Sequence, residues 1–407
     1  MQPESSKMSS KIRVAVLFGG RSVEHEISII TALQLMAALD LKRYQPIPVY
    51  IAPDGKWFSG DELFEREFYK QGAAALRRLD EVTLLPCPGE SGLQLVRRGF
   101  MDKVLSLFCP SSDRLPVDIF LPAFHGEFGE DGCIQGLLEM ADVAYTSSGV
   151  LSSSVAMNKY ICKSVLQTHG IPSLPAALVN KFEATADLAK ARAEILATPG
   201  LEAYPLFVKP NHLGSSIGIG RAENETGLNA ALARVFLHDL QAIVEPCLTE
   251  MFEINVSVMD GEPACASVVE IPVSQSGLLS YEEKYMRDKG RKKTGESSGG
   301  MASLTRSIDP ENLPAAIKDQ VSAYALKAFR LLDCRGVVRF DFMFDKRAEQ
   351  IYFNELNPLP GSFSFYLWVK SHPPLLYTEE LSLLIEHALK RKQQSAAVQR
   401  NLGFRAL

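Results

Sequence analysis

The stretch FNELNPLPG, residues 353–361, ends an apolar, strand-like run and carries two polar side chains two positions apart. Side chains two positions apart on a strand lie on the same face, so Glu355 and Asn357 point in one direction. The Pro-Gly pair at 360–361 follows at once and restricts the backbone directly behind them. The sequence therefore predicts a strand that ends by presenting a carboxylate and a carboxamide side by side.

A second strand candidate, VVRFDFMF (337–344), precedes this one and is joined to it by the turn DKRAE. By the same alternation, Arg339 and Asp341 share one face. If the two faces coincide in a hairpin, Asp341, Glu355 and Asn357 form a cluster of oxygen donors with Arg339 beside it. A few hard oxygen ligands on rigid strands suit Mg²⁺ that is held jointly with nucleotide phosphates. The alternative is a solvated polar face with a surface ion pair.

A glycine- and serine-rich loop, NHLGSSIGIG (211–220), follows the short strand candidate LFVKP (206–210). Such a loop offers backbone N–H groups to phosphate oxygens, and the ammonium group of Lys209 can reach the same phosphates. The loop lacks the Gly-Lys-Ser/Thr ending that defines a P-loop. An ordinary flexible hairpin turn is the alternative interpretation.

The segment GGRSVEHEIS (19–28) follows the first strand candidate, at the edge of a doubly wound sheet where ligands bind. Glu24, His25 and Glu26 do not form a metal site, because three consecutive side chains cannot all face one ion. Glu26 fits a helix start, where an acidic side chain interacts favourably with the helix dipole. Glu24 is better placed to meet the ammonium group of a substrate.

The composition excludes several classes of protein. The 407 residues suggest two or three domains, and 46% hydrophobic and 22% charged residues are ordinary for a soluble globular protein. The net charge of −5 argues against a dedicated nucleic-acid binder. No apolar run approaches the roughly 18 residues of a membrane span, and the polar start lacks the features of a signal peptide. The seven cysteines are isolated, as is typical of reduced thiols, so we predict a cytoplasmic protein.

Apolar runs alternate with helical patterns in the first third of the chain, which predicts an α/β fold with a doubly wound parallel sheet. The strand candidates there cover residues 12–20, 46–52, 117–126 and 143–149, with a helix from about 28 to 39. The segment 53–116 is irregular and predicts no clear element.

Later elements are also marked by end signals. We expect one helix between Ser152 and His169, closed by Gly170, and a strand at 241–248 that breaks at a proline. A further helix begins after Asp309-Pro310, where aspartate caps and proline takes the first helical position. Its apolar residues recur at helical spacing and are Ile317, Val321, Ala325, Ala328 and Leu332.

These segments, in this order, resemble the D-alanine–D-alanine ligase family of ATP-grasp enzymes over about residues 12–390. The most specific matches are GGRSVEHEIS (19–28), FHGEFGEDGCIQGLLE (124–139), TSSGVLSSSVAMNK (146–159), VKPNHLGSSIGIG (208–220), EKY (283–285), CRGVVRFD (334–341) and NELNPLPG (354–361). The family uses ATP to join two D-alanines into the dipeptide needed for bacterial peptidoglycan. The resemblance implies an α+β ATP-grasp architecture, in which an N-terminal doubly wound parallel sheet domain is followed by two ATP-grasp domains.

The resemblance also implies the domain limits. They are a disordered leader at 1–10, an α/β substrate-binding domain at 11–150, a central ATP-grasp lid domain at 151–248, and a C-terminal ATP-grasp domain at 249–407 that holds the metal site and a mobile loop at about 286–303. This loop is basic and glycine-containing, and a closing lid over the reaction is the role we expect for it.

Many residues match the family's nucleotide-binding positions, which implies ATP and two Mg²⁺ ions, with Mn²⁺ as a substitute. They are Lys159 and Lys209 for the phosphates; Ser216 in the glycine-serine loop; Glu245, Pro246 and Leu248 for adenine; Glu253 for ribose, although the hinge is one residue longer here; and Asp341, Glu355 and Asn357 for magnesium.

Further matches surround the substrates. Glu24, Ser215 and Tyr285 look like the family's hydrogen-bonded trio, which helps to hold the first substrate and the closed loop. His125 matches a histidine at the border of the first substrate's site, and Lys284 matches a lysine close to phosphate and substrate carboxylate. The resemblance therefore implies a first-substrate site made by three separate segments.

The segment after the Pro-Gly turn departs from the family pattern. Arg339 and the backbone N–H of Gly361 match the groups that stabilise the oxyanion of the reaction. The following run is SFSFYLW (362–368), which places Tyr366 where the family has a serine that binds the second substrate's carboxylate, and Pro358 replaces the usual threonine. A tyrosine hydroxyl also donates to carboxylates, but from a different distance.

We therefore expect an enzyme that joins two D-alanines through an acyl phosphate, giving D-alanyl-D-alanine, ADP and phosphate. Its partners are D-amino acids and ATP, with no nucleic acid and no membrane, and the family suggests a homodimer. The first alternative is a ligase of the same mechanism with another second substrate, an amino acid or a hydroxy acid. Depsipeptide-forming relatives tend to have histidine at the position of Tyr285, which disfavours ester formation here. The other alternative is a non-catalytic nucleotide-binding protein that keeps the fold.

Overall fold

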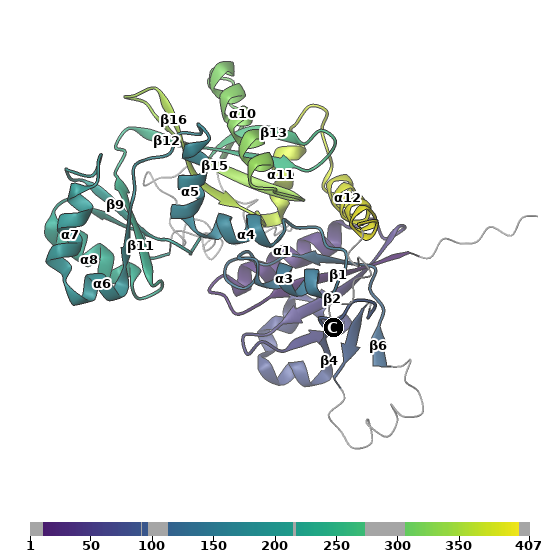
Figure 1. Ribbon diagram of the computed structural model, residues 1–407. Helices are drawn as coiled ribbons and strands as arrows, with labels where there is room; N and C mark the ends of the chain where they lie inside the picture. The colour runs from purple at the N-terminus through teal and green to yellow at the C-terminus, as the bar shows by residue number, and fades with distance from the viewer. Residues whose placement is uncertain (1–10, 91, 97–112, 215–216, 273–305, 399–407) are drawn as a thin grey trace, which may run out of the picture.

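The computed structural model describes residues 11–90, 92–96, 113–214, 217–272 and 306–398, and these residues form three β-sheets with helices packed on them (Figure 1). In the same view the first sheet lies at the lower right, the second at the left and the third at the top. Within the described residues, no helix has the length and apolar character that crossing a membrane requires.

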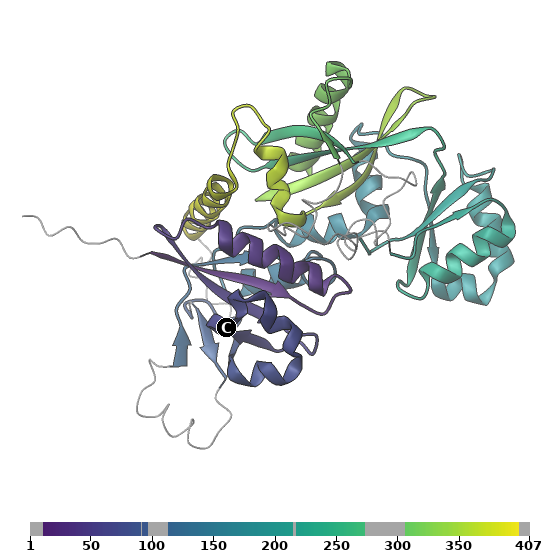
Figure 2. The same ribbon diagram turned by 180° about the vertical axis from the view of Figure 1, so that it is seen from behind.

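The first sheet has a parallel centre and an antiparallel extension. Strand β1 (Ile12–Gly19) pairs in parallel with β2 (Tyr44–Ile51) and β7 (Ile119–Pro122), as the α/β prediction requires. Residues Val14–Phe18 are fully buried, because both faces of a parallel strand are covered. Helix α1 (His25–Ala38) follows β1 and lies along the sheet (Figure 2).

The antiparallel extension of this sheet comes from the segment 53–116, in which the sequence predicts no clear element. Its strands are β3 (Trp57–Ser59), β4 (Asp80–Thr83), β5 (Leu93–Leu95) and β6 (Arg114–Leu115), and three 3₁₀ helices, Asp61–Phe64, Arg66–Gln71 and Ala73–Arg78, connect β3 to β4. By contrast, the predicted strand at 143–149 is wrong, because only a single bridge, Phe120 to Tyr145, forms there before the chain turns into the next helix.

The second sheet is antiparallel and four-stranded. Its strands, in spatial order, are β10 (Gly220–Ala222), β9 (Leu206–Pro210), β11 (Gln241–Pro246) and β8 (Ala177–Asn180). Helices α6 (Lys181–Ala186), α7 (Leu188–Ala197) and α8 (Glu225–Val235) pack on it. In the antiparallel pairing of β9 and β11, Lys209 lies opposite Ile243 and Phe207 lies opposite Glu245, so Lys209 and Glu245 are close neighbours on adjacent strands.

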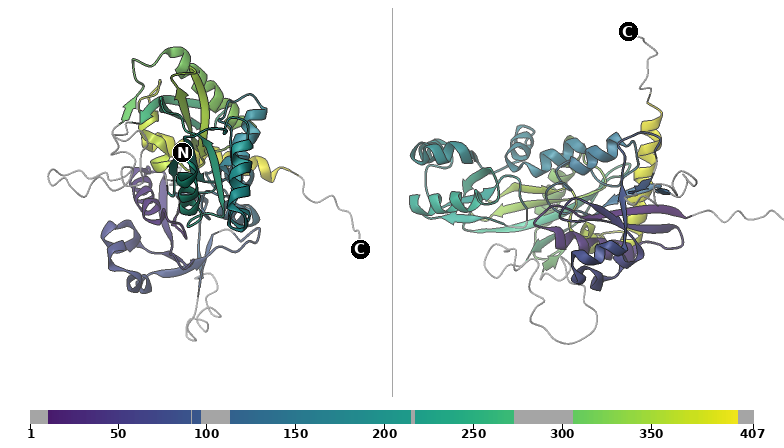
Figure 3. Two further views of the ribbon diagram at one scale, coloured as in Figure 1. Left: turned by 90° about the vertical axis from the view of Figure 1, so that its left-hand side faces the viewer. Right: turned by 90° about the horizontal axis from the view of Figure 1, so that it is seen from below.

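The third sheet is antiparallel and five-stranded. Its strands, in spatial order, are β14 (Arg306–Ile308), β13 (Cys265–Pro272), β12 (Met251–Met259), β15 (Val337–Asp345) and β16 (Gln350–Asn357). The helical elements around it are α4 (Val150–Met157), α5 (Lys159–Thr168), α10 (Ala315–Leu331), the 3₁₀ turn η7 (Gly361–Ser364) and α11 (Phe365–Trp368). Helix α12 (Tyr377–Ala396) follows α11 and packs against α1 and β7, so that its buried residues join the core of the first sheet. Figure 3 shows α12 near one end of the molecule and the second sheet with its helices at the other.

Two helix predictions are wrong in detail. The single helix expected at 152–169 is split into α4 and α5, because Asn158 leaves the helical conformation and accepts a hydrogen bond from the N–H of Ile161. The helix expected to begin after Asp309-Pro310 begins at Ala315, after a second proline, and Asp309 pairs with Lys318 at 2.6 Å instead of capping. Pro314 directly precedes the first helical residue, Ala315, so the helix starts later than the Asp309-Pro310 pair indicated.

Candidate active site

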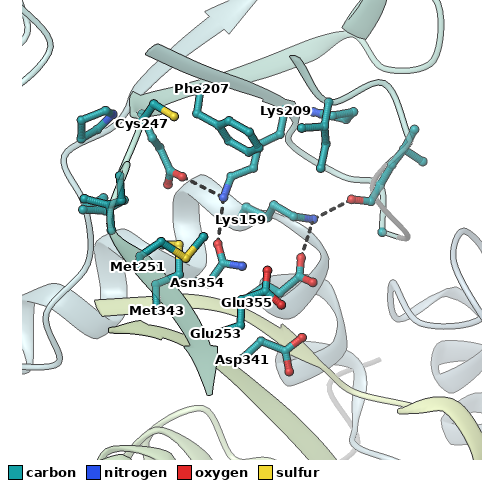
Figure 4. Close-up of a pocket in the computed structure, with 18 residues that line it drawn as sticks. Lys159, Phe207, Lys209, Cys247, Met251, Glu253, Asp341, Met343, Asn354 and Glu355 are labelled. Carbon is teal, nitrogen blue, oxygen red and sulfur yellow. Dashed lines mark hydrogen bonds and ion pairs between the residues drawn. The ribbon is translucent and has the colours of Figure 1, made fainter. Parts of the chain in front are cut away.

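A pocket of about 810 Å³ lies between the second and third sheets (Figure 4). It is lined by Lys159, Leu174, Phe207, Lys209, Pro210, Leu213, Gly214, Ile219, Glu245, Pro246, Cys247, Leu248, Met251, Glu253, Asp341, Met343, Asn354 and Glu355. Apolar side chains alternate with charged ones around it. Such a lining suits a ligand with a flat apolar part and an anionic part.

The hairpin of β15 and β16 has the register in which the two polar faces coincide. Arg339 lies opposite Asn357, and Asp341 lies opposite Glu355. Both oxygens of Asp341 accept a hydrogen bond of 2.7 Å from the guanidinium group of Arg339, and the amide of Asn357 donates to Asp341 at 3.1 Å. The oxygen-bearing side chains are therefore gathered at one end of the hairpin, with the arginine beside them.

A β-bulge in this hairpin brings in a residue that the sequence analysis missed. The pairing shifts between Asp341 and Phe342, so that Asn354 stands unpaired between Phe353 and Glu355. Because a bulge places two consecutive residues on one side of a strand, Asn354 and Glu355 both line the pocket. The side-chain oxygen Oδ1 of Asn354 accepts a hydrogen bond of 3.0 Å from the ammonium group of Lys209. Simple alternation puts Asn354 on the opposite face, so no local signal could have revealed it.

The hairpin donors fit a divalent cation that is shared with a ligand. Asp341, Glu355 and Asn357 supply two carboxylates and one amide oxygen, all hard donors. Among the residues that the structure describes, no group of three or more His, Cys, Asp or Glu side chains is suited to hold a metal alone. A cation here therefore needs further oxygen ligands, such as phosphates, to complete its shell.

Two lysines face this hairpin from the other wall of the pocket. Lys159 opens helix α5, donates to the carbonyl of Leu213 at 2.6 Å and lies 3.5 Å from Glu355. Lys209 ends β9 and lies 2.8 Å from Glu245. The dashed lines in Figure 4 join Lys209 to Asn354 and Lys159 to Glu355. Both lysines are buried, so their charge is only weakly screened by water.

The residues that the family resemblance assigns to adenine and ribose line the same pocket. Glu245 and Pro246 end β11, and Leu248 and Glu253 follow on the connection and on β12. Although burial opposes its ionisation, the neighbouring lysines lower the pKa of Glu245, so its side chain is a carboxylate held by Lys163 and Lys209. Lys163 is a second residue that the sequence analysis missed.

A second pocket, of about 630 Å³, adjoins the first and shares Lys159, Gly214 and Glu355 with it. Its other lining residues are Glu24, His125, Glu130, Ala156, Met157, Arg339, Leu356, Asn357, Pro358, Leu359, Pro360 and Gly361. The first and third sheets both contribute to it. A group bound in one pocket thus lies next to a group bound in the other.

In this second pocket the side chain of His125 is neutral and that of Arg339 is positively charged. Burial, with help from Arg339, lowers the pKa of His125 to about 4, so its imidazole is neutral near pH 7. Its Nε2 lies 2.9 Å from the hydroxyl of Thr31. Although burial opposes its charge, Asp341 raises the pKa of Arg339 well above its usual value, so the guanidinium stays cationic.

Glu130 is a third residue that the sequence analysis missed, although it lies in the motif FHGEFGEDGCIQGLLE. Its carboxyl group accepts hydrogen bonds from the N–H of Gly126 at 2.6 Å and of Leu359 at 3.3 Å, which ties a loop of the first sheet to the segment after β16. Burial and the nearby Glu24 raise the pKa of Glu130 well above the ordinary value.

The segment after the Pro-Gly turn is tightly wound. Ser362, Phe363 and Ser364 have φ angles of 49°, 56° and 58°, a left-handed conformation that side-chain-bearing residues rarely adopt in succession. The hydroxyl of Ser362 donates to Gln34 of α1, which fixes the turn against the first sheet. Backbone strain of this kind is found at functional sites.

Tyr366 lies just beyond this turn and is buried. Its hydroxyl donates to Glu270 at 3.1 Å, and the guanidinium group of Arg306 stacks over its ring at 3.8 Å while pairing with Glu270 at 2.8 Å. Burial, with Glu270, raises the pKa of Tyr366 to about 12. The predicted acceptor-binding hydroxyl is therefore already bonded to Glu270.

Four predicted site residues, Ser215, Ser216, Lys284 and Tyr285, lie outside the described residues, as does the predicted lid loop at 286–303. The other predicted residues line the two pockets, except Tyr366, which lies in the adjoining cluster with Arg306.

Comparison with known proteins gives matches along nearly the whole chain. The family described as D-ala D-ala ligase N-terminus matches residues 13–148, and the D-ala D-ala ligase C-terminus matches residues 165–386. The D-alanine–D-alanine ligase of Chloroherpeton thalassium is 34% identical over 94% of this chain and 97% of its own. The D-alanine–D-alanine ligase A of Bradyrhizobium diazoefficiens is 35% identical over 97% of this chain and 99% of its own.

Solved structures agree with this match. The D-alanine–D-alanine ligase from Coxiella burnetii superposes with a TM-score of 0.73 at 26% identity, covering 95% of this chain and 97% of the other. The VanG D-Ala:D-Ser ligase from Enterococcus faecalis gives a TM-score of 0.72 at 24% identity, covering 93% and 99%, which shows the fold alone. The predicted resemblance is confirmed: the chain belongs to the D-alanine–D-alanine ligase family and has its ATP-grasp fold.

Proposed function

We propose that the protein joins two D-alanines in an ATP-dependent reaction, giving D-alanyl-D-alanine, ADP and phosphate for peptidoglycan synthesis. The observation that carries this proposal is that the two pockets share Lys159, Gly214 and Glu355. A triphosphate end bound in the first pocket then lies beside a carboxylate bound in the second. That adjacency is what phosphoryl transfer between two bound substrates requires.

The first pocket is the ATP site in this proposal. The apolar hinge wall with Pro246 and Leu248 takes adenine, Glu253 takes the ribose, and Lys159 and Lys209 take the phosphates. Asp341, Glu355 and Asn357 would hold Mg²⁺, as two ions and with Mn²⁺ as a substitute. Bound there, the metal would neutralise phosphate charge during transfer.

The second pocket is the site of the first D-alanine. The carboxylate of Glu24 meets its ammonium group, and the neutral imidazole of His125 borders it. The substrate carboxylate attacks the γ-phosphorus, the bond from phosphorus to the bridging oxygen of ADP breaks, and an acyl phosphate forms. A free carboxylate is a poor electrophile, so this activation is necessary before an amide can form.

The second step makes the peptide bond. The amine of the second D-alanine, after its ammonium form has given one proton to solvent, attacks the acyl carbon. Phosphate leaves with its bonding electron pair, and the nitrogen gives a second proton to the departing phosphate, which leaves the neutral amide. The guanidinium of Arg339 and the N–H of Gly361 line the pocket where negative charge gathers on the carbonyl oxygen. Preformed donors of this kind each contribute about 10²–10³ in rate.

Water has to be kept from the acyl phosphate. We assign this task to the lid at about 286–303, together with Lys284 near the phosphate and with the trio of Glu24, Ser215 and Tyr285. Ser216 completes the phosphate-binding loop. We also propose the three-domain division at residues 11–150, 151–248 and 249–407, a homodimer, and a cytoplasmic location.

A different second substrate is the alternative, and Tyr366 supports it. The hydroxyl of Tyr366 is bonded to Glu270, and its ring lies under the guanidinium group of Arg306. The acceptor region would then be bordered by a bulky aromatic ring that is itself in contact with a cation. Another amino acid or a hydroxy acid is then the acceptor, and the first half-reaction is unchanged.

The experiment measures ADP release and product identity with ATP, Mg²⁺ and D-alanine alone, and then with D-alanine and a panel of second substrates. Saturable ADP release with D-alanine alone, yielding the dipeptide, supports the proposal. ADP release that needs a different second substrate supports the alternative. No ADP release with any substrate contradicts both and leaves a nucleotide-binding protein.

A further inference from the structure

Lys163 is a buried cation behind the nucleotide pocket. It lies one helical turn after Lys159 on α5, its side chain is 3% exposed, and it lines neither pocket. Its ammonium group donates to one carboxylate oxygen of Glu245. A lysine is rarely buried without a task, because burial of its charge is costly.

The carboxylate of Glu245 forms ion pairs with the ammonium groups of two lysines at once. Lys163 bonds to Oε1, and Lys209 lies 2.8 Å from Oε2. Lys209 reaches this carboxylate from the neighbouring strand, where it also bonds to Asn354. The single negative charge of Glu245 is thus shared between Lys163, which lies behind the pocket, and Lys209, which lines it.

We propose that Lys163 is a positioning residue for nucleotide binding, which neutralises Glu245 so that the charge of Lys209 remains available to the phosphates of ATP. This inference rests on the proposed function only in taking a nucleoside triphosphate as the ligand. Lys163 does not touch the ligand and acts through Glu245.

The charge balance explains why a second lysine is needed. If Lys163 were absent, Glu245 and Lys209 would form a one-to-one buried pair with no net charge. An incoming phosphate would then have to compete with Glu245 for Lys209, in a buried site where such pairs are strong. With Lys163 present, the group of Lys163, Lys209 and Glu245 has a net charge of +1, which attracts an anion.

Protonation of Lys163 supports the same conclusion. The groups that face it are Glu245 on β11, Lys209 on β9 and Glu355 on β16, with Lys159 and Cys162 beside it on α5. Burial lowers the pKa of Lys163 to about 8, against the opposing effect of Glu245. At pH 7, below this value, Lys163 therefore carries the charge that neutralisation of Glu245 requires.

The test compares direct ATP affinity, by calorimetry with Mg²⁺ at pH 7, in wild type, Lys163→Met, Glu245→Gln and the double variant Lys163→Met/Glu245→Gln. The single variant is expected to bind ATP about 10-fold more weakly, a change of about 1.4 kcal/mol. In a Glu245→Gln background, which is measured as its own reference so that any direct loss of adenine contact cancels, Lys163→Met is expected to change ATP affinity less than about threefold, because no carboxylate then holds Lys209. Lys190→Met, which removes an exposed lysine of α7, is the matched control.

A folded Lys163→Met protein that binds ATP as wild type does overturns the inference, and so does a Lys163→Met effect that is as large in the Glu245→Gln background as in wild type. If Lys163→Met does not fold, Lys163→Gln, which keeps a hydrogen-bond donor toward Glu245 but not the charge, replaces it in the same comparison: ATP affinity equal to wild type overturns the inference, and binding about 10-fold weaker supports it. Absence of ATP binding in wild type itself contradicts the proposed function instead.

Discussion

Arg339 donates two hydrogen bonds of 2.7 Å to the two carboxylate oxygens of Asp341, its neighbour two positions along the same strand. Asn357 of the partner strand donates to the same carboxylate. This ion pair fixes the orientation of both side chains. We assign the carboxylate of Asp341 to magnesium binding and the guanidinium of Arg339 to stabilisation of the oxyanion. Two steps of the proposed reaction thus depend on one rigid contact.

Replacing Arg339 by lysine is expected to lower kcat by about 10²–10³ while the protein stays folded. Lysine keeps the positive charge but lacks the planar fork that bonds both oxygens of Asp341. Steady-state ADP release measures the effect. Arg347→Lys, an exposed arginine at the turn of the same hairpin, is the control, and an equal kcat in the two variants would contradict the role of Arg339.

Glu355→Gln is expected to lower turnover roughly 100-fold or more, because the amide keeps the shape of the side chain but loses the charge that a divalent cation needs. Glu349→Gln changes an exposed glutamate on the same hairpin and should leave turnover unchanged. Initial rates of ADP release at saturating substrates compare the two variants. A Glu355→Gln enzyme with wild-type turnover would exclude Glu355 as a metal ligand.

Tyr366→Phe is expected to raise the apparent KM for the second amino acid about 2- to 10-fold, the effect of losing one buried hydrogen bond. The hydroxyl bond to Glu270 is lost, while the ring under Arg306 remains. The KM for ATP should stay nearly unchanged, since Tyr366 does not line the nucleotide pocket. An acceptor KM equal to that of wild type would show that Tyr366 has no part in the acceptor site.

Glu380→Met is expected to stabilise the protein by about 1–3 kcal/mol near neutral pH. Glu380 on α12 is fully buried, and neither carboxylate oxygen has a hydrogen-bond partner in the described part of the chain. Burial raises its pKa well above 4.5, so the folded protein favours the protonated form. The stability that this proton provides is complete below pH 4.5 and is lost as the pH rises toward the folded-state pKa.

The stabilising effect of Glu380→Met should therefore be larger at pH 8 than at pH 5, as measured by the midpoint of thermal unfolding. Glu379→Met is the matched control, because Glu379 is exposed and accepts the N–H of Leu376 at the helix start. That change should not stabilise the protein. A Glu380→Met midpoint at or below the wild-type value at pH 8 would contradict a buried, unpartnered carboxyl group.

The sequence predicted the features that depend on local alternation. The polar face of each of the two strands β15 and β16 followed from side chains spaced two apart, and the pairing of Asp341 with Glu355 shows that the two faces coincide. The bulge at Asn354 could not be predicted, because one unpaired residue leaves no mark in an alternating pattern. The break at Asn158 was missed for a similar reason, since asparagine occurs both within and at the starts of helices.

Contacts between distant segments also could not be predicted. Lys163 and Glu245 are 82 positions apart, and Glu130 and Leu359 are 229 positions apart, so their pairing depends on how the sheets pack. The short strands β3 to β6 have too few residues for a clear period. β3 pairs with β2, and β4, β5 and β6 each pair with the strand before it.

The central claim is that the final hairpin binds a divalent cation together with the triphosphate of ATP. The most direct measurement is the effect of Mg²⁺ on ATP affinity, determined by calorimetry in wild type and in Asp341→Asn/Glu355→Gln. We predict that Mg²⁺ strengthens ATP binding at least about 10-fold in wild type and has little effect in the variant. An equal Mg²⁺ effect in both proteins would contradict the account.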